Sequence, residues 1–292
     1  MFNRQIFIGG FAINHPHEVM NSLCELSIVT ISREIDESLT RTRHSIEAIR
    51  EHVEWIVILG PTALDNHLLA EEIGADRVHY QRSSGLYDAM NLGLRQSTRP
   101  FVWFLNGGDT LDGPQGLRLL CEKVCTSDAS WGFGSLTLQS GRTREFSPAS
   151  YARRKSAGFA NGVMPPQPAT IYRRKDLEVI GGFDCSLAIA ADLKAALLMA
   201  AVAEPVIEPS FRVRLEPGGV SSRDRFAAVK EIVVVLRELR SSGKVNLRLS
   251  QCVFFLSSAM LGAAVTWGVA GVSNCLKSVS GIIRSETRGS LL

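Results

Sequence analysis

Short runs of apolar and β-branched residues alternate with segments whose apolar residues recur at helical spacing. The runs cover residues 26–31, 54–59, 77–80 and 101–105. Runs of this length are typical of strands covered on both faces. Between the first two runs, a helix is predicted from about Asp36, with one apolar stripe made of Leu39, Ile46, Ile49 and Val53. The pattern predicts a right-handed β-α-β unit, a parallel sheet and an α/β fold.

The rest of the chain continues this alternation and then changes character. The pattern predicts a helix around 117–124, a hairpin over 131–138 and 143–146, and helices around 189–200 and 226–236. Residues 249–276 then contain no charged side chain. We expect three parts: an N-terminal extension (1–25), a globular α/β domain (26–222) and a C-terminal helical region (223–292).

The uncharged stretch 249–276 raises the question of a membrane. It is long enough to span a bilayer, but it is rich in Ser, Gly and Ala, and basic residues flank it on both sides. A span, a helix lying in the membrane surface and a helix packed on a partner all fit this pattern. We expect contact with a membrane surface through 249–276 and leave the mode of contact open.

Composition and charge exclude several classes of protein. The formal net charge is +3, and no basic run is interleaved with aromatic residues, so nucleic acid is not an expected partner. The six cysteines form no C-x-x-C pair, which predicts a reducing compartment and no structural zinc. Residues 1–25 lack the pattern of a signal peptide. These features favour a cytoplasmic location.

The loop after the first predicted strand bears on whether this is a dinucleotide-binding oxidoreductase, the usual first hypothesis for an α/β fold. A dinucleotide-binding oxidoreductase would carry G-x-G-x-x-G there, whereas this chain has Ser32-Arg33-Glu34. The missing glycines argue against that class. They also argue against a nucleotidyltransferase, for which we would expect a Gly-rich loop with Arg or Lys after the first strand.

Two aspartates are candidates for chemistry. Asp109 follows a predicted buried strand and the pair Gly107-Gly108. In α/β folds, ligands bind beyond the carboxyl ends of the strands, and glycines let a ligand or metal approach the backbone. Asp192 lies near the start of a predicted helix, where a carboxylate is favoured. The alternatives without chemistry are that Asp109 only closes a turn and that Asp192 only stabilises the start of a helix.

Several blocks of the sequence resemble family 2 glycosyltransferases of the kind that assemble colanic acid and other bacterial surface polysaccharides. Residues 85–91 (G-L-Y-D-A-M-N) and 104–109 (F-L-N-G-G-D) are similar to two blocks of that family at the right separation. Residues 27–33, 54–57, 167–174, 181–192 and 218–221 resemble further blocks. The resemblance covers residues 26 to about 222.

The resemblance implies a fold, a reaction and roles for particular residues. The fold would be GT-A, a Rossmann-like, nucleotide-binding mixed sheet flanked by helices, here followed by the uncharged helical extension. The reaction would be inverting transfer from a nucleotide-sugar donor to a hydroxyl of a saccharide or lipid-linked acceptor. Because lipid-linked acceptors in the pathways of this family lie at the cytoplasmic face, the resemblance also implies that 249–276 contacts the inner face of the membrane. Asp192 would be the catalytic base, and Asp109 would hold Mg²⁺ or Mn²⁺. The donor would be bound by Thr30, Arg33, Asp88, Asn91 and Asn106, while Gln167, Gly218 and Gly219 would lie on the acceptor side or behind the reacting groups.

The sequence departs from the family on the donor side. Where these enzymes carry D-G-x-S-x-D-G-T after the second strand, this chain has residues 59–66, L-G-P-T-A-L-D-N. A further family acid is replaced by Ser83, and Gln167 stands where a His is usual, so no imidazole titrates there. Two functions therefore stay open: an active glycosyltransferase, or a degenerate GT-A domain that acts as a binding or scaffolding subunit.

Overall fold

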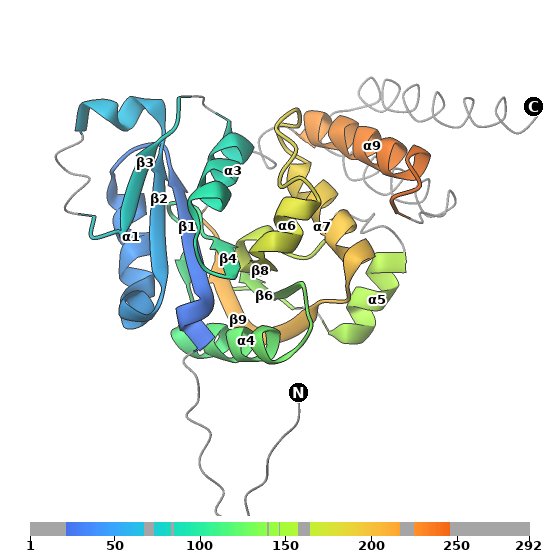
Figure 1. The fold of residues 1–292 in the computed structure, drawn as a ribbon, viewed down its shortest axis with the longest axis horizontal. Helices are drawn as coiled ribbons and strands as arrows, with labels where there is room; N and C mark the ends of the chain where they lie inside the picture. Colours follow the sequence, from blue (N-terminus) through green and yellow to red (C-terminus); the bar gives the residue numbers. More distant parts are fainter. Residues whose placement is uncertain are drawn as a thin grey trace, which may run out of the picture.

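The computed structural model describes residues 22–66, 73–82, 85–138, 140–145, 147–156, 164–216 and 225–245. Within these ranges, one nine-stranded mixed sheet is flanked by helices on both faces (Figure 1). The sheet has the order β3-β2-β1-β4-β8-β6-β9-β5, and β7 pairs with β6 at its side. The predicted α/β class is confirmed. The stretch 249–276 and most of the expected N-terminal extension lie outside the described residues.

The first half of the sheet is parallel, as the pattern predicted. It consists of β1 (Leu26–Ser32), β2 (Glu54–Leu59), β3 (Arg77–Tyr80) and β4 (Phe101–Phe104). The connections are α1 (Glu37–Ile46), the 3₁₀ helices η2 (Glu47–His52) and η3 (Pro61–Asn66), and α3 (Leu86–Gln96). Asp36 begins α1, because its carboxylate accepts the backbone N–H groups of Ser38 and Leu39 at 3.0 and 3.1 Å. The carboxyl ends of β1, β2, β3 and β4 therefore share one edge.

The second half of the sheet is mixed. β8 (Thr170–Arg173) runs antiparallel to β4 and to β6 (Trp131–Thr137), and β9 (Val206–Arg214) joins β6 to β5 (Thr110–Leu111). The predicted hairpin is confirmed, because β6 pairs antiparallel with β7 (Thr143–Arg144). The remaining helices are η1 (Ser22–Glu25), α4 (Pro114–Thr126), α5 (Pro148–Ser156), η4 (Gln167–Ala169), α6 (Arg174–Val179), α7 (Ala191–Val202) and α9 (Arg225–Ser241).

Two apolar clusters cover the two faces of the sheet. Successive residues of β2 alternate between them: Trp55 packs toward α1 and α4, and Ile56 packs toward α3 and α7. Figure 1 shows α1 on one side of the sheet and α3, α6 and α7 on the other. α7 is buried on nearly all sides, because α9 covers its outer face with Leu236 and Leu239. Helix α9 is thus packed into the same core as the helix that carries Asp192.

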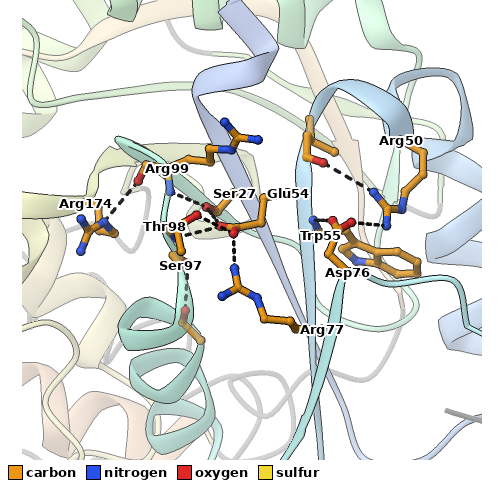
Figure 2. A network of polar contacts seen from close by, with 12 residues as sticks. Ser27, Arg50, Glu54, Trp55, Asp76, Arg77, Ser97, Thr98, Arg99 and Arg174 are labelled. Carbon is orange, nitrogen blue, oxygen red and sulfur yellow. Dashed lines mark hydrogen bonds and ion pairs between the residues drawn. The ribbon is translucent and has the colours of Figure 1, made fainter. Parts of the chain in front are cut away.

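A buried acid holds the strands together at the amino edge of the sheet (Figure 2). The carboxylate of Glu54 accepts the hydroxyl of Ser27, and it accepts the N–H and the hydroxyl of Thr98 at 2.8 and 2.6 Å. Arg77 of β3 pairs with the same carboxylate. Although burial raises the pKa of Glu54, these hydrogen bonds outweigh it and leave the pKa below its usual value. The network ties β1, β2, β3 and the turn after α3 at the edge opposite the carboxyl ends.

No helix in the described ranges combines the length and the apolar character that crossing a bilayer requires.

Candidate active site at the carboxyl edge of the sheet

A pocket of about 490 Å³ opens at the carboxyl ends of β1, β2 and β3. This is the edge at which α/β sheets bind ligands. Its walls come from the turn after β1, the turn after β2, the residue after β3, the start of α3 and the segment before α7. The lining residues are Ile31, Ser32, Arg33, Gly60, Pro61, Thr62, Gln81, Gly85, Leu86, Tyr87, Asp88, Cys185, Ser186, Leu187 and Ala188.

The turns after β1 and β2 are pressed together on one side of this pocket. Gly60 donates its N–H to the carbonyl of Ser32 at 2.8 Å, and a Cβ at Gly60 would lie 2.9 Å from the carbonyl oxygen of Arg33. A larger residue than glycine would therefore push the turns apart. Thr62 donates its hydroxyl to the same Arg33 carbonyl at 3.2 Å. Arg33 and Asp88 are the charged side chains among the lining residues.

Gln81 is a polar group of the pocket that the sequence pattern did not single out. Its side chain is 9% exposed, and its Oε1 has no hydrogen-bond partner among the described residues. Its backbone N–H donates to the carbonyl of Leu59 at 2.9 Å, which fixes the residue beside the turn after β2. A buried oxygen without a partner costs free energy, and a ligand N–H in the pocket would relieve that cost.

Asp109 lies beside the pocket, on the turn between β4 and β5. The turn is anchored to the end of β1, because Gly107 donates its N–H to the carbonyl of Ile31 at 2.8 Å. A Cβ at Gly107 would lie 2.8 Å from the hydroxyl oxygen of Ser32, a residue of the pocket wall. The next residue, Gly108, has a φ of 97°, a backbone conformation that favours glycine. These contacts place the Asp109 turn against the β1 end of the pocket.

The carboxylate of Asp109 is 6% exposed and lies close to a second acid. Its Oδ1 accepts the backbone N–H of Glu216 at 2.8 Å. Burial raises the pKa of Asp109 to about 7, and the negative charge of Glu216 adds to the shift, while the Glu216 N–H opposes it. Arg41 pairs with the Glu216 carboxylate at 3.0 Å. Asp109 itself makes no ion pair in the part of the chain that the structure describes.

Asp192 lies in the first turn of α7 and is linked to the pocket by Tyr87. Its Oδ1 accepts the N–H of Leu193 at 2.8 Å, and the hydroxyl of Tyr87 is 3.4 Å from the same oxygen. Tyr87 lines the pocket and also donates to the carbonyl of Ile189 at 2.6 Å. Burial raises the pKa of Asp192 to about 6, and the carboxylate of Glu231 on α9 contributes in the same direction, while the bonds from Leu193 and Tyr87 lower it. Such a group is ionised at neutral pH and is still basic.

Comparison with known proteins decides the family. No family model matches the chain. Two proteins of Mycobacterium tuberculosis do match: the uncharacterized glycosyltransferase Rv1514c of strain H37Rv and the uncharacterized glycosyltransferase MT1564 of strain CDC 1551. Each is 31% identical over 237 residues, which cover 78% of this chain and 87% of the relative. The chain belongs to the glycosyltransferases.

Solved structures are similar to this glycosyltransferase in fold. Staphylococcus aureus TarS 1-349, in complex with UDP-GlcNAc, has a TM-score of 0.65 at 14% identity and covers 89% of this chain and 81% of that chain. The mannosyltransferase PcManGT from Pyrobaculum calidifontis, in complex with GDP-Man and Mn²⁺, has a TM-score of 0.55 at 15% identity and covers 88% and 80%. At these identities the likeness shows a shared fold, a mixed α/β sheet flanked by helices.

The structure brings some of the predicted donor residues of the glycosyltransferase to the pocket and places others behind it. Arg33 and Asp88 line the pocket. The side chain of Thr30 is fully buried and accepts the indole N–H of Trp55 at 3.0 Å, so it points into the core between β1 and α1. The side-chain amide of Asn91 donates to the carbonyl of Phe183 at 2.7 Å and accepts the Phe183 N–H at 2.9 Å. Asn91 therefore holds the G-G-F-D turn.

The remaining predicted residues lie near Asp109 or outside the described ranges. Asn106 belongs to the Asp109 turn, where its carbonyl accepts the Asp109 N–H at 3.0 Å. Gln167 is 8% exposed, and its Nε2 lies 3.5 Å from the carbonyl of Phe104 at the end of β4. Gly218 and Gly219 lie outside the described residues. Neither Asp109 nor Asp192 lines the pocket itself; Asp192 is linked to it through Tyr87, and the Asp109 turn through Ser32. Neither aspartate is held in an ion pair within the described ranges.

The acidic groups of this site fit a divalent cation that arrives with a diphosphate. Within the described residues, no cluster of three or more His, Cys, Asp or Glu side chains forms a ready-made cage. Mg²⁺ is usually held by one or two carboxylates together with substrate phosphates, so a single carboxylate such as that of Asp109 would be enough on the protein side. The side-chain oxygen of Asn106 is buried without a hydrogen-bond partner among the described residues, and it provides a second hard oxygen on the same turn.

Proposed function

We propose that this glycosyltransferase moves one sugar from a nucleotide-sugar donor to a hydroxyl of a saccharide or lipid-linked acceptor, with inversion at the anomeric carbon. One observation carries the proposal: Asp192, with a pKa of about 6, adjoins through Tyr87 the same pocket that the Asp109 turn borders. A general base must be ionised at the working pH and within reach of the proton that it removes. The fold class under this proposal is GT-A, and the pathway is surface polysaccharide assembly.

In the proposed reaction, Asp192 accepts the proton of the acceptor hydroxyl as its oxygen attacks the anomeric carbon. The bond from that carbon to the oxygen of the donor phosphate breaks on the opposite face, and its electron pair leaves with the nucleoside diphosphate. Inversion follows because the attacking and leaving oxygens are on opposite faces of the sugar. Tyr87 orients the base through its contact with Oδ1 of Asp192 at 3.4 Å.

Asp109, with Asn106 beside it, would hold Mg²⁺ or Mn²⁺. A bound divalent cation neutralises the charge that develops on a departing diphosphate. The structure of PcManGT, which contains GDP-Man and Mn²⁺, supports a divalent ion in a relative of this fold. Burial and the neighbouring Glu216 make a proton on Asp109 favourable without a cation, and a cation at the carboxylate favours the ionised form.

The donor nucleotide would lie in the pocket between the turns after β1, β2 and β3. Arg33 would make a charge-assisted hydrogen bond to the diphosphate, and Gln81 Oε1 would accept an N–H of the nucleobase. These two contacts would replace those of the acids that the family carries after the second strand. On the membrane side, the uncharged stretch 249–276 would bring the enzyme to lipid-linked acceptors at the cytoplasmic face.

A turnover assay with matched variants tests this function. Purified protein is incubated with a panel of UDP and GDP sugars, with and without Mn²⁺, and nucleoside diphosphate release is measured. We expect release with one donor class, dependence on Mn²⁺ and loss of release in Asp192→Asn. Asp128→Asn is the control, because Asp128 is an exposed residue before β6, at the amino edge of the sheet. Equal rates in Asp192→Asn and Asp128→Asn would contradict the proposed base.

The second candidate function is a binding or scaffolding subunit. It is favoured by the composition of the pocket, in which Asp88 is the one acid among the lining residues. Calorimetric titration with UDP and GDP separates the candidates. If the protein neither turns over a donor nor binds a nucleotide, the scaffold is supported. If it binds a nucleotide and turns over a donor, the enzyme is supported.

A further inference from the structure

Glu231 of α9 is hydrogen-bonded to residues 188–190, the segment that leads into α7. Its Oε1 accepts the backbone N–H of Ala188 at 2.9 Å, and its Oε2 accepts those of Ile189 and Ala190 at 2.7 and 2.8 Å. One carboxylate thus satisfies three consecutive backbone donors just before a helix begins, where an anionic group is favoured. The contact is long-range, because it joins the C-terminal helix of the described chain to the loop in front of Asp192.

The gripped segment connects directly to both the pocket and the proposed base. Ala188 lines the pocket. The carbonyl of Ile189 accepts the hydroxyl of Tyr87 at 2.6 Å, and that hydroxyl is 3.4 Å from Oδ1 of Asp192. A shift of this segment would therefore move Tyr87 and the first turn of α7 together. Small displacements of reacting groups have large effects on rate.

A second contact between α9 and α7 provides a comparison on the same helix. Lys194 donates to Glu238 at 2.7 Å and to Asp184 at 2.6 Å, and its side chain is 14% exposed. Glu238 therefore holds α9 against α7 without touching the segment in front of Asp192. If α9 acted only by packing, the loss of either acid would have similar consequences.

We propose that Glu231 is a positioning residue for sugar transfer: from α9 it fixes the 188–190 segment, and through that segment it sets the positions of Tyr87 and Asp192. This inference rests on the proposed function. It makes α9 part of the catalytic machinery. It also gives the C-terminal region a physical route to the base, because any movement of α9 changes the grip of Glu231.

The test compares the variants Glu231→Gln, Glu231→Asp and Glu238→Gln with the unmodified protein in the donor-turnover assay. We expect kcat of Glu231→Gln to fall by about tenfold to a hundredfold, with donor KM within about threefold, because one misplaced reacting group lowers the rate more than it weakens ground-state binding. Glu231→Asp keeps the charge at a shorter reach, and its kcat should lie between those of Glu231→Gln and the unmodified protein. Glu238→Gln should keep kcat within about twofold, because its contact is a partly exposed ion pair.

Hydrogen exchange supplies a readout that does not depend on activity. In Glu231→Gln the amides of 188–190 should exchange faster than in the unmodified protein, while those of the α7 interior should not. In Glu238→Gln the amides of 188–190 should keep their protection. A uniform loss of protection over α7 and α9 in Glu231→Gln would identify a general stability effect and would overturn the positioning role.

The outcomes separate this inference from the proposed function. If the unmodified protein turns over a donor, Asp192→Asn does not, and Glu231→Gln keeps its kcat, the positioning role is wrong and the proposed function stands. If no donor is turned over by the unmodified protein, the proposed function fails and the positioning role fails with it. Faster exchange at 188–190 would then assign to Glu231 a purely structural grip on the segment.

Discussion

The hydroxyl of Tyr87 lies 3.4 Å from Oδ1 of Asp192 while it donates to the carbonyl of Ile189 at 2.6 Å. Tyr87 comes from α3 and lines the pocket, whereas Asp192 opens α7 on the far side of that pocket wall. This contact joins α3, which packs on the parallel half of the sheet, to α7, which carries the proposed base.

Removal of this hydroxyl should lower kcat and shift its pH dependence. In Tyr87→Phe, Asp192 loses a hydrogen bond that lowers its pKa, so the acidic limb of the rate profile should move to higher pH. We expect kcat to fall by about tenfold, since a hydrogen bond to an ionised carboxylate contributes about 1.5 kcal/mol or more. Steady-state kinetics between pH 5 and pH 9 measure both effects. Tyr80→Phe is the control, because the Tyr80 hydroxyl has no hydrogen-bond partner among the described residues; an equal loss in both variants would contradict the role of Tyr87.

The unmodified protein should itself show an acidic limb near pH 6. Burial raises the pKa of Asp192 to about 6, so the base is protonated below that pH and ionised above it. We expect kcat/KM to rise about tenfold per pH unit below pH 6 and to level off above it. The measurement needs saturating Mn²⁺, so that Asp109, whose pKa is about 7 without a cation, stays ionised throughout. A limb near pH 4 would show that the base titrates as an ordinary exposed carboxylate.

Asp109 should make the protein less stable as pH rises. Its pKa is raised from 3.8 to about 7, so between these values the folded state holds a proton that the unfolded state has released. Stability therefore falls through this window, and the loss persists above it. Asp109→Asn should raise Tm by a few degrees at pH 8 and change it little at pH 4, as thermal melts at both pH values can establish. Asp128→Asn should change Tm at neither pH, and an Asp109→Asn variant less stable at pH 8 would contradict the assigned burial cost.

Glu54 should have the opposite dependence on pH. Its pKa lies below the usual 4.5, because the hydrogen bonds from Ser27 and Thr98 and the charge of Arg77 outweigh the cost of burial. The stabilisation is present above the usual pKa and is lost as pH falls through the lowered one. Glu54→Gln should destabilise the protein by about 3 kcal/mol at pH 7, since it breaks a buried pair, and the difference should shrink toward pH 3. Urea unfolding at each pH measures the free energy of unfolding. Glu178→Gln is the control: it breaks the exposed pair with Arg174 and should cost under about 1 kcal/mol.

The parallel half of the fold was predictable from sequence because its signals are local, and so were the places of Asp109 after a strand and of Asp192 at a helix start, whereas their roles in chemistry stay predictions. The short β-branched runs form β1, β2, β3 and β4, and the hairpin forms β6 and β7. Asp109 follows a strand and two glycines, and Asp192 opens a helix, so each position is fixed by its neighbours along the chain. The order of the motif blocks then indicated that these local features belong to one site.

Other parts of the site depend on contacts that the chain does not reveal locally. Thr30 and Ile31 are neighbours on β1, but strand residues alternate in direction, so Thr30 enters the core and Ile31 enters the pocket wall. Glu231 lies among the charged residues of an amphipathic helix, and only the packing of α9 on α7 brings it to the 188–190 segment. Gln81 follows a short strand, and nothing in the sequence around it indicates that its side-chain oxygen is buried without a hydrogen-bond partner among the described residues.

Gln81 should contribute to nucleotide affinity. Gln81 belongs to the pocket wall, and its Oε1 is buried without a hydrogen-bond partner among the described residues. A donor N–H that reaches this oxygen after a rotation of the side chain gains a bond without displacing another. Gln81→Leu keeps a similar volume and removes the acceptor, and we expect the Kd for the preferred nucleoside diphosphate to rise about fivefold, in line with one hydrogen bond of about 1 kcal/mol. Calorimetric titration with UDP and GDP measures the change. Gln96→Leu, at the end of α3 and outside the pocket wall, is the matched control. Because a buried oxygen without a partner costs free energy, the unliganded Gln81→Leu variant should be at least as stable as the unmodified protein. Tighter nucleotide binding by this variant would contradict the role of Gln81 in nucleotide affinity.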